Sequence, residues 1–240
     1  MKLGIVVGHN SAKQGAVRVD TGESEYSYNS RIAERMMRLA RTSHIPNLDA
    51  RVFYRQAGMG FRAEIEKVYA ETDAWGADLT MELHFNGSEN PDVSGTEVLS
   101  SGTRLSLLAA HEVQEELIQL LDLEDRGVKT RARHERGGRS LFSGRAPAIL
   151  VEPFFGSSPI GTSKTDEEHE EEMLAKSYLF GAATALSQFP NSGIVASALM
   201  QSPAIEDDQG EVKQLTPEEE HFLARIMRRF GFVRVEEVDL

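Results

Sequence analysis

Short apolar runs and longer amphipathic stretches alternate along the chain as far as residue 189. Runs that alternate apolar with polar residues, or that are apolar and β-branched throughout, predict strands. Stretches with apolar residues on one helical face predict helices. The predicted strands are residues 3–7, 49–54, 79–83, 95–100 and 148–151. The predicted helices are residues 25–41, 61–75, 105–121 and 166–186.

Alternating strands and helices are typical of an α/β fold, with a mostly parallel twisted sheet and helices on both faces. Residues 126–139 are polar and predict a loop with one short strand around Val128. After residue 190 the composition changes to that of a linker, and Thr216-Pro217 then begins a predicted helix with a capping residue and a proline in its first turn. We expect one main domain over residues 1–189 and a small C-terminal helix–strand extension, with its linker, over residues 190–240.

The composition excludes several classes of protein. The net charge of -12 among 240 residues argues against nucleic-acid binding, which requires a basic face. The absence of cysteine excludes disulfides, thiolate catalysis and zinc sites built from cysteine. The sequence contains no apolar run of about 18 residues and no leader resembling a signal peptide, so we expect no transmembrane segment and synthesis in the cytoplasm.

Two of the predicted strands run directly into a histidine. His9 follows strand 3–7, and His84 follows strand 79–83. Ligands in open α/β sheets bind beyond the carboxyl ends of the strands, so the two imidazoles are expected to meet at one edge. Two imidazoles form part of a metal site, because catalytic zinc usually takes three protein ligands and keeps one position open.

Carboxylates that would complete such a site lie in two places. The segment after His9 contains Asp20, Glu23 and Glu25, any of which could supply the third ligand. Glu152 closes strand 148–151 and is expected at the same edge of the sheet. A carboxylate beside a metal-activated water is what metal-assisted amide hydrolysis requires, because it takes up and returns the proton.

A series of motifs occurs in a defined order from residue 3 to about residue 187. In chain order they are Gly8-His9, Gly15-Ala16, Glu25 with Asn29, Arg55, Ala77-Asp78, Leu83-His84-Phe85-Asn86, Gly95-Thr96-Glu97-Val98, Arg126-Gly127-Val128-Lys129 and Pro147-Ala148-Ile149-Leu150-Val151-Glu152. In this set the chain resembles the zinc-dependent N-acetylmuramoyl-L-alanine amidases of the amidase-3 type.

The resemblance implies a role for six residues. His9, Glu25 and His84 would bind Zn2+, and Glu152 would be the catalytic glutamate. Arg55 and Asn86 would contact the substrate. The reaction implied is hydrolysis of the amide between N-acetylmuramic acid and the L-alanine of the stem peptide, so the expected partner is peptidoglycan.

The sequence departs from the family at several positions, including Asn10, where glycine is common, and Phe85, which replaces a small residue. Glu82 precedes His84 by two residues, where the family usually has a small or apolar residue. Residues 129–145 are unusually basic, which suggests either a solvated face or an electrostatic contact with stem-peptide carboxylates.

Two other functions are considered beside this interpretation, and the sequence also suggests a biological setting. One rival is another zinc hydrolase, such as a carboxypeptidase or small-molecule amidohydrolase, and the other is a non-catalytic cell-wall-binding or virion protein. The apparent lack of a leader suggests a phage or prophage endolysin that reaches the cell wall or periplasm with help from a partner. The oligomeric state stays open, with a monomer favoured. The remaining histidines are expected at the surface.

Overall fold

The structure, a computed structural model, describes residues 1–42, 45 and 47–188. Within these residues, six strands form one sheet in the order β2-β1-β3-β6-β4-β5. The strands are β1 (Lys2–Val7), β2 (Asp49–Tyr54), β3 (Leu79–Leu83), β4 (Thr96–Ser100), β5 (Asp125–Thr130) and β6 (Ala148–Glu152). Strands distant in sequence are therefore neighbours, as expected where helices connect them.

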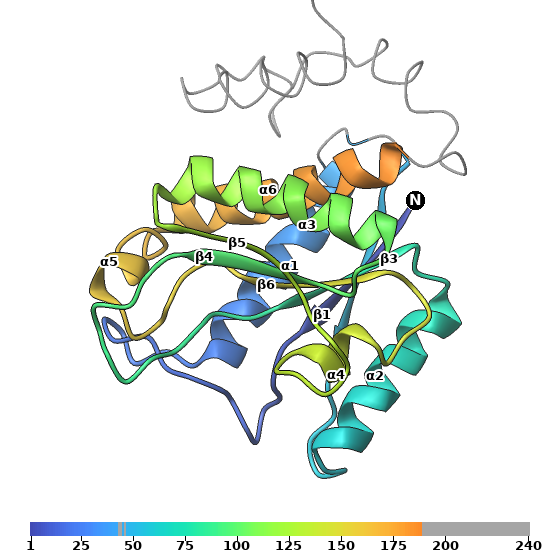
Figure 1. The fold of residues 1–240 in the computed structure, drawn as a ribbon, viewed down its shortest axis with the longest axis horizontal. Coiled ribbons are helices and arrows are strands. Elements are labelled where there is room, and N and C mark those ends of the chain that lie inside the picture. Colours follow the sequence, from blue (N-terminus) through green and yellow to red (C-terminus); the bar gives the residue numbers. More distant parts are fainter. Residues whose placement is uncertain (43–44, 46, 189–240) are drawn as a thin grey trace, which may run out of the picture. The chain divides into compact units, whose positions relative to one another are not determined.

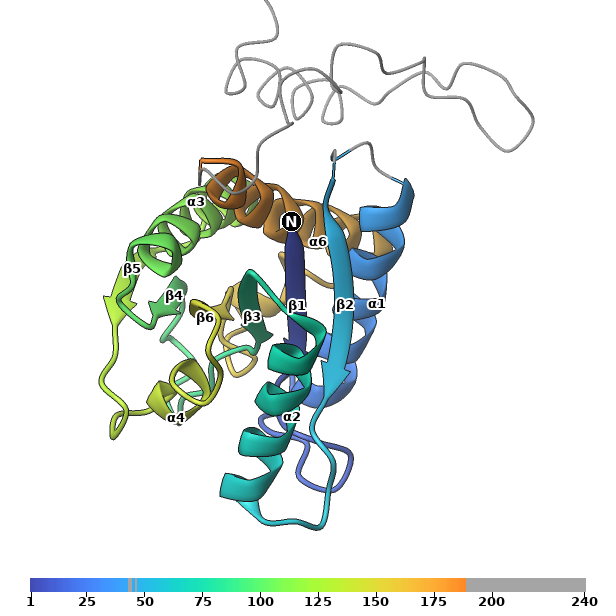
Figure 2. The same ribbon diagram turned by 90° about the vertical axis from the view of Figure 1, so that its right-hand side faces the viewer.

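Helices cover both faces of this sheet, which confirms the predicted α/β fold. The helices are α1 (Glu25–Thr42), α2 (Phe61–Trp75), α3 (Arg104–Leu121), α4 (Gly138–Leu141), α5 (Pro159–Thr162) and α6 (Glu168–Ser187). Helices α1, α3 and α6 lie on one face, and α2 and α4 lie on the other (Figures 1 and 2). None of the helices in the described part of the chain combines the length and the apolarity that crossing a lipid bilayer requires.

The pairing of the strands brings several chain segments to one edge of the sheet. Strands β2, β1, β3 and β6 are parallel, with Val7 opposite Leu83 and Leu83 opposite Val151. Strand β4 is antiparallel to β6, and its Glu97 pairs with Glu152. The edge at which β1, β3 and β6 end is therefore also the edge at which β4 begins.

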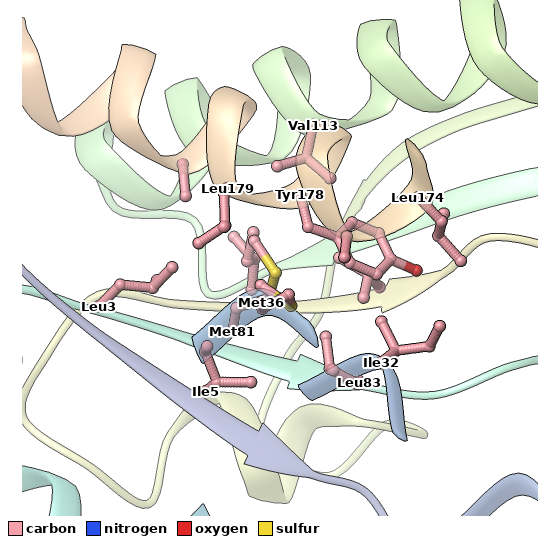
Figure 3. Packing of buried hydrophobic residues seen from close by; sticks show 14 of the residues in the cluster. Leu3, Ile5, Ile32, Met36, Met81, Leu83, Val113, Leu174, Tyr178 and Leu179 are labelled. Atoms are coloured by element: carbon pink, nitrogen blue, oxygen red, sulfur yellow. The ribbon is translucent and has the colours of Figure 1, made fainter. Parts of the chain in front are cut away.

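The hydrophobic core is divided between the two faces of the sheet. Figure 3 shows the larger core, in which Ile5 and Met81 of the sheet pack beneath Leu179 of α6 and Val113 of α3. Val6, the neighbour of Ile5, belongs to a smaller cluster on the opposite face, together with residues of α2. Successive strand residues point to opposite faces, so the same strands pack against helices on both sides of the sheet.

The predicted elements differ from the observed ones mainly where the segments are short. Helices α4 and α5 span four residues each and were not predicted, and β5 is longer than the strand expected around Val128. Three of the histidines expected at the surface, His111, His134 and His169, are exposed. His44, His221 and the predicted C-terminal extension lie outside the described residues.

Candidate active site

The two strand-end histidines meet where β1 and β3 end. Their ring centroids are 5.1 Å apart, with the ring planes at 72°. The backbone N–H of Gly8 donates a hydrogen bond of 3.0 Å to the carbonyl of Leu83, which links the two strand ends directly. His9 has a φ of 64°, a left-handed conformation that non-glycine residues rarely adopt and that is often found at functional sites.

Glu25, the first residue of α1, lies between the two imidazoles. Its Oε2 is 3.1 Å from Nε2 of His9, and its Oε1 is 2.7 Å from Nδ1 of His84. One ligand atom from each of the three residues lies within 4.8 Å of the others, as a shared metal ion would require. The other candidate carboxylates pair with arginines instead, Glu23 with Arg31 at 2.5 Å and Asp20 with Arg18 at 2.7 Å.

Two glycines leave room for this cluster. A Cβ on Gly8 would lie 2.5 Å from Cε1 of His84, and one on Gly15 would lie 2.5 Å from Oε2 of Glu25. Gly15 also has a φ of 81°, which a side chain would strain. Any larger residue at either position would therefore displace a candidate ligand.

The pKa values in this cluster depend on how the imidazoles interact with Glu25 and with Glu82, a buried carboxylate of β3. Burial favours the neutral form of Glu25, but hydrogen bonds and attraction from His84 and His9 outweigh it and lower its pKa to about 2. Burial alone would lower the pKa of His84, but Glu25 and Glu82 raise it to about 9. The His84 imidazole therefore lies between two ionised carboxylates, an arrangement that suits a cation.

A second carboxylate centre lies beside the first, at the end of β6. The amide Nδ2 of Asn86 donates hydrogen bonds to both Glu152 and Glu97, the latter at 3.1 Å. On its other side, Glu97 accepts from Nε of Arg126 at 3.0 Å and forms an ion pair with Lys129. The antiparallel pairing of β4 and β6 thus places two glutamates side by side, and Arg126 and Lys129 both pair with Glu97.

This arrangement separates the protonation states of the two glutamates. Burial and the proximity of Glu97 raise the pKa of Glu152 to about 7, despite opposing attraction from His84 and Arg136. The pKa of Glu97 is lowered to about 2, because Lys129 and Arg126 outweigh the effect of its burial. Glu152 can therefore exchange a proton near neutral pH, whereas Glu97 stays ionised.

The basic segment contributes one side chain to this centre. Arg136 lies 3.5 Å from Oε1 of Glu152 and donates a 3.1 Å hydrogen bond to Oδ1 of Asn86. Its side chain is 73% exposed, so most of it is available to another molecule.

Arg55, expected from the sequence to contact substrate, is buried. Its guanidinium pairs with Glu82, and it also donates to the hydroxyl of Ser140 at 3.2 Å. Asn86 is likewise buried, between the two glutamates. A substrate role for either residue stays a prediction.

Sequence reasoning assigned no role to Glu97 or Glu82, and it considered Arg136 only as part of the basic segment 129–145. Glu97 stood in a family motif, but its contact with Glu152 depends on an antiparallel pairing that strand patterns do not reveal. Glu82 was visible only as an unexpected charge in a buried strand. Arg136 was one of several arginines in residues 129–145, and only its location in the fold distinguishes it.

Comparison with known proteins gives a consistent result. The sequence matches the profile of the N-acetylmuramoyl-L-alanine amidase family, Amidase_3, over residues 3–183. No match was found among curated proteins.

Among solved structures, the catalytic domain of the CD27L endolysin targeting Clostridia difficile is 25% identical, with a TM-score of 0.63 over 76% of this chain and 96% of that one. An N-acetylmuramoyl-L-alanine amidase from Clostridium difficile 630 is 19% identical, with a TM-score of 0.66 over 78% of this chain and 97% of that one. Cwp6 from Clostridium difficile is 20% identical, with a TM-score of 0.64 over 75% of this chain but only 28% of that longer one. The chain belongs to the N-acetylmuramoyl-L-alanine amidase family and is an enzyme that hydrolyses the amide bond between N-acetylmuramic acid and L-alanine in peptidoglycan.

Proposed function

We propose that this amidase is zinc-dependent and that His9, Glu25 and His84 hold the metal ion. The observation that carries this assignment is the convergence of two imidazoles and a carboxylate, from three separate elements, within 4.8 Å. Two histidines and one glutamate are a known ligand set of catalytic zinc. Gly8 and Gly15 leave the ligand atoms uncovered by side chains, so the residues present fit such an ion.

Zinc bound there would lower the pKa of a water molecule and polarise the substrate carbonyl. Glu152 is the general base, whose carboxylate takes a proton from the attacking water. Its pKa of about 7 suits this role, because at neutral pH a substantial fraction is ionised and the protonated form remains accessible. Glu152 then gives the proton to the leaving nitrogen of L-alanine, so the carboxylate is regenerated at the end of the cycle.

Substrate binding is proposed to involve the exposed cation next to Glu152. Arg136 can pair with a carboxylate of the stem peptide or with the oxygen that gains negative charge as the amide is attacked. Asn86 would keep Glu152 in the orientation needed for proton transfer through its hydrogen bond. The buried contacts of Arg55 favour a supporting role over direct contact with substrate.

The likeness to the catalytic domain of an endolysin supports a lytic setting. We propose that the enzyme acts on the cell wall and that a phage or prophage encodes it.

Elemental analysis combined with digestion of purified sacculi tests the mechanism. The wild-type protein should hold about one zinc per chain and release intact stem peptides that begin with L-alanine. Glu152→Ala should retain zinc but lose activity by roughly 10²–10⁴-fold, because the general base is missing. His84→Ala should lose both zinc and activity.

Other outcomes would change either the mechanism or the function. Normal hydrolysis by Glu152→Ala would remove Glu152 from the mechanism. Release of single amino acids from the peptide C-terminus would indicate a carboxypeptidase. Zinc without any turnover would indicate a wall-binding protein.

A further inference from the structure

Glu82 is fully buried in the middle strand of the sheet, at a position where an ionised group is costly. It is 0% exposed and lies two residues before His84 on β3. A buried carboxylate persists only when its oxygens are fully hydrogen-bonded or paired with charge. Glu82 meets this condition through Tyr69 and Arg55, which come from two other parts of the fold.

Both oxygens of Glu82 are held by protein donors. The hydroxyl of Tyr69, on α2, donates to Oε2 at 2.8 Å, and Arg55, which follows β2, pairs with Oε1. Arg55 is held in turn by Ser140 of α4 at 3.2 Å. The carboxylate therefore has a fixed orientation.

The same carboxylate faces His84. Nε2 of His84 lies 3.1 Å from Oε1 of Glu82, while Nδ1 lies 2.7 Å from Oε1 of Glu25. An ionised carboxylate can only accept a hydrogen bond, so the nitrogen facing Glu82 must carry a proton. One nitrogen of the His84 ring thus faces the buried network around Glu82, and the other faces the candidate ligand cluster.

We propose that Glu82 is a positioning residue of the metal centre, which keeps the proton of His84 on Nε2 and presents Nδ1 to the metal. This inference rests on the proposed zinc site. It also explains why a charge is maintained in the core of the sheet, and why Arg55 and Tyr69 surround it. Carboxylates that hold the outer nitrogen of a metal-binding histidine typically contribute 10- to 100-fold in metal affinity.

The test is a measurement of zinc affinity by competition with a chelator, using Zn2+ itself as the probe. Glu82→Gln should weaken zinc binding by roughly 10-fold or more. Because this variant leaves Arg55 buried without a counter-ion, the double variant Arg55→Gln/Glu82→Gln removes both charges together and should lose zinc affinity to a similar extent. Tyr69→Phe, which keeps Glu82 but removes one donor to it, should have a smaller effect in the same direction.

A matched control separates positioning from general destabilisation. Glu171 is also buried and paired with arginines, Arg31 at 2.6 Å and Arg35 at 3.1 Å, and none of its described contacts reaches the ligand cluster. Glu171→Gln should lower stability yet leave zinc affinity unchanged. In the zinc-bound wild-type protein, nitrogen NMR should find the proton of His84 on Nε2.

The outcomes distinguish this inference from the proposed function. Wild-type protein that binds no zinc would overturn the metal centre and the role of Glu82 together. Wild-type protein that binds zinc, with an affinity matched within twofold by the folded double variant, would overturn the role of Glu82 alone. A proton found on Nδ1 of His84 in the zinc-bound protein would do the same.

Discussion

Two buried glutamates on neighbouring strands of this sheet have opposite acid–base behaviour. Glu82 on β3 lies opposite Leu150, two residues before Glu152 on β6, so both carboxylates are on the same face of the sheet. Burial favours the neutral form of each. For Glu82 the guanidinium of Arg55 and the ring of His84 outweigh burial and hold its pKa well below the usual range. For Glu152 the carboxylate of Glu97 adds to burial and raises the pKa to about 7.

Burial acts in the same direction on both groups, so the difference between their charges follows from their neighbours. A glutamate with its own arginine stays ionised and can only accept hydrogen bonds. A glutamate next to a second glutamate holds its proton more tightly and can exchange it near neutral pH. The first is suited to fixing an imidazole, and the second to moving a proton.

The largest expected effect comes from removing the cation of the first pair. Arg55→Met should lower the free energy of unfolding by about 3–5 kcal/mol, because Glu82 would remain buried without its main counter-ion. Urea denaturation measures this directly. Arg62→Met, which breaks an exposed pair with Glu66 at 2.6 Å, is the control and should change stability by less than about 1 kcal/mol. Equal effects of the two variants would mean that Arg55 does not hold the charge of Glu82.

A somewhat smaller effect, of opposite sign, is expected in the second pair. The pKa of Glu152 is raised on folding, so its contribution to stability is present at low pH and is lost as the pH rises toward 7. Glu152→Gln cannot ionise, and it should therefore be more stable than wild type at pH 8, by about 2 kcal/mol, with little difference at pH 5. Urea denaturation at the two pH values would show this. A gain of equal size at both would contradict it.

The contrast between these two glutamates could be predicted only in part from the sequence. Period-2 patterns located β1, β3 and β6, and hence the edge at which His9, His84 and Glu152 end their strands. Strand and helix patterns could not choose among Asp20, Glu23 and Glu25, because the path of a long loop depends on contacts that no local pattern encodes, and only the family resemblance favoured Glu25. In the structure Arg31 and Arg18 pair with two of them, and Glu25 lies between the imidazoles.

Other features were missed for related physical reasons. Four-residue helices such as α4 are too short to show a helical period. The charge state of Glu152 depends on Glu97, which is 55 positions earlier in the numbering and becomes its neighbour only because β4 runs antiparallel to β6. A buried charge such as Glu82 is visible in the sequence, but its partners Arg55 and Tyr69 are known only once the elements pack.

The smallest expected effect is a displacement of the pH profile. Activity requires ionised Glu152, so kcat/KM should rise with pH through about 7. The charged groups that act on Glu152 are Glu97, which raises its pKa, and His84 and Arg136, which lower it. Glu97→Gln removes the only one of these that raises the pKa and releases the cations Arg126 and Lys129 from their partner. The acid limb should therefore move to lower pH by about one unit.

Glu97→Gln keeps nearly the same side-chain shape, and the glutamine can still accept the hydrogen bond from Asn86. Glu124→Gln, an equal change of net charge at an exposed position, provides the control and should leave the profile where it is. A matching displacement in both variants would mean that the overall charge of the protein, and not the neighbouring carboxylate, sets the pKa of Glu152. An acid limb that stays in place in Glu97→Gln would mean that Glu97 does not raise the pKa of Glu152, and the contrast between Glu82 and Glu152 would then not be set by this neighbour.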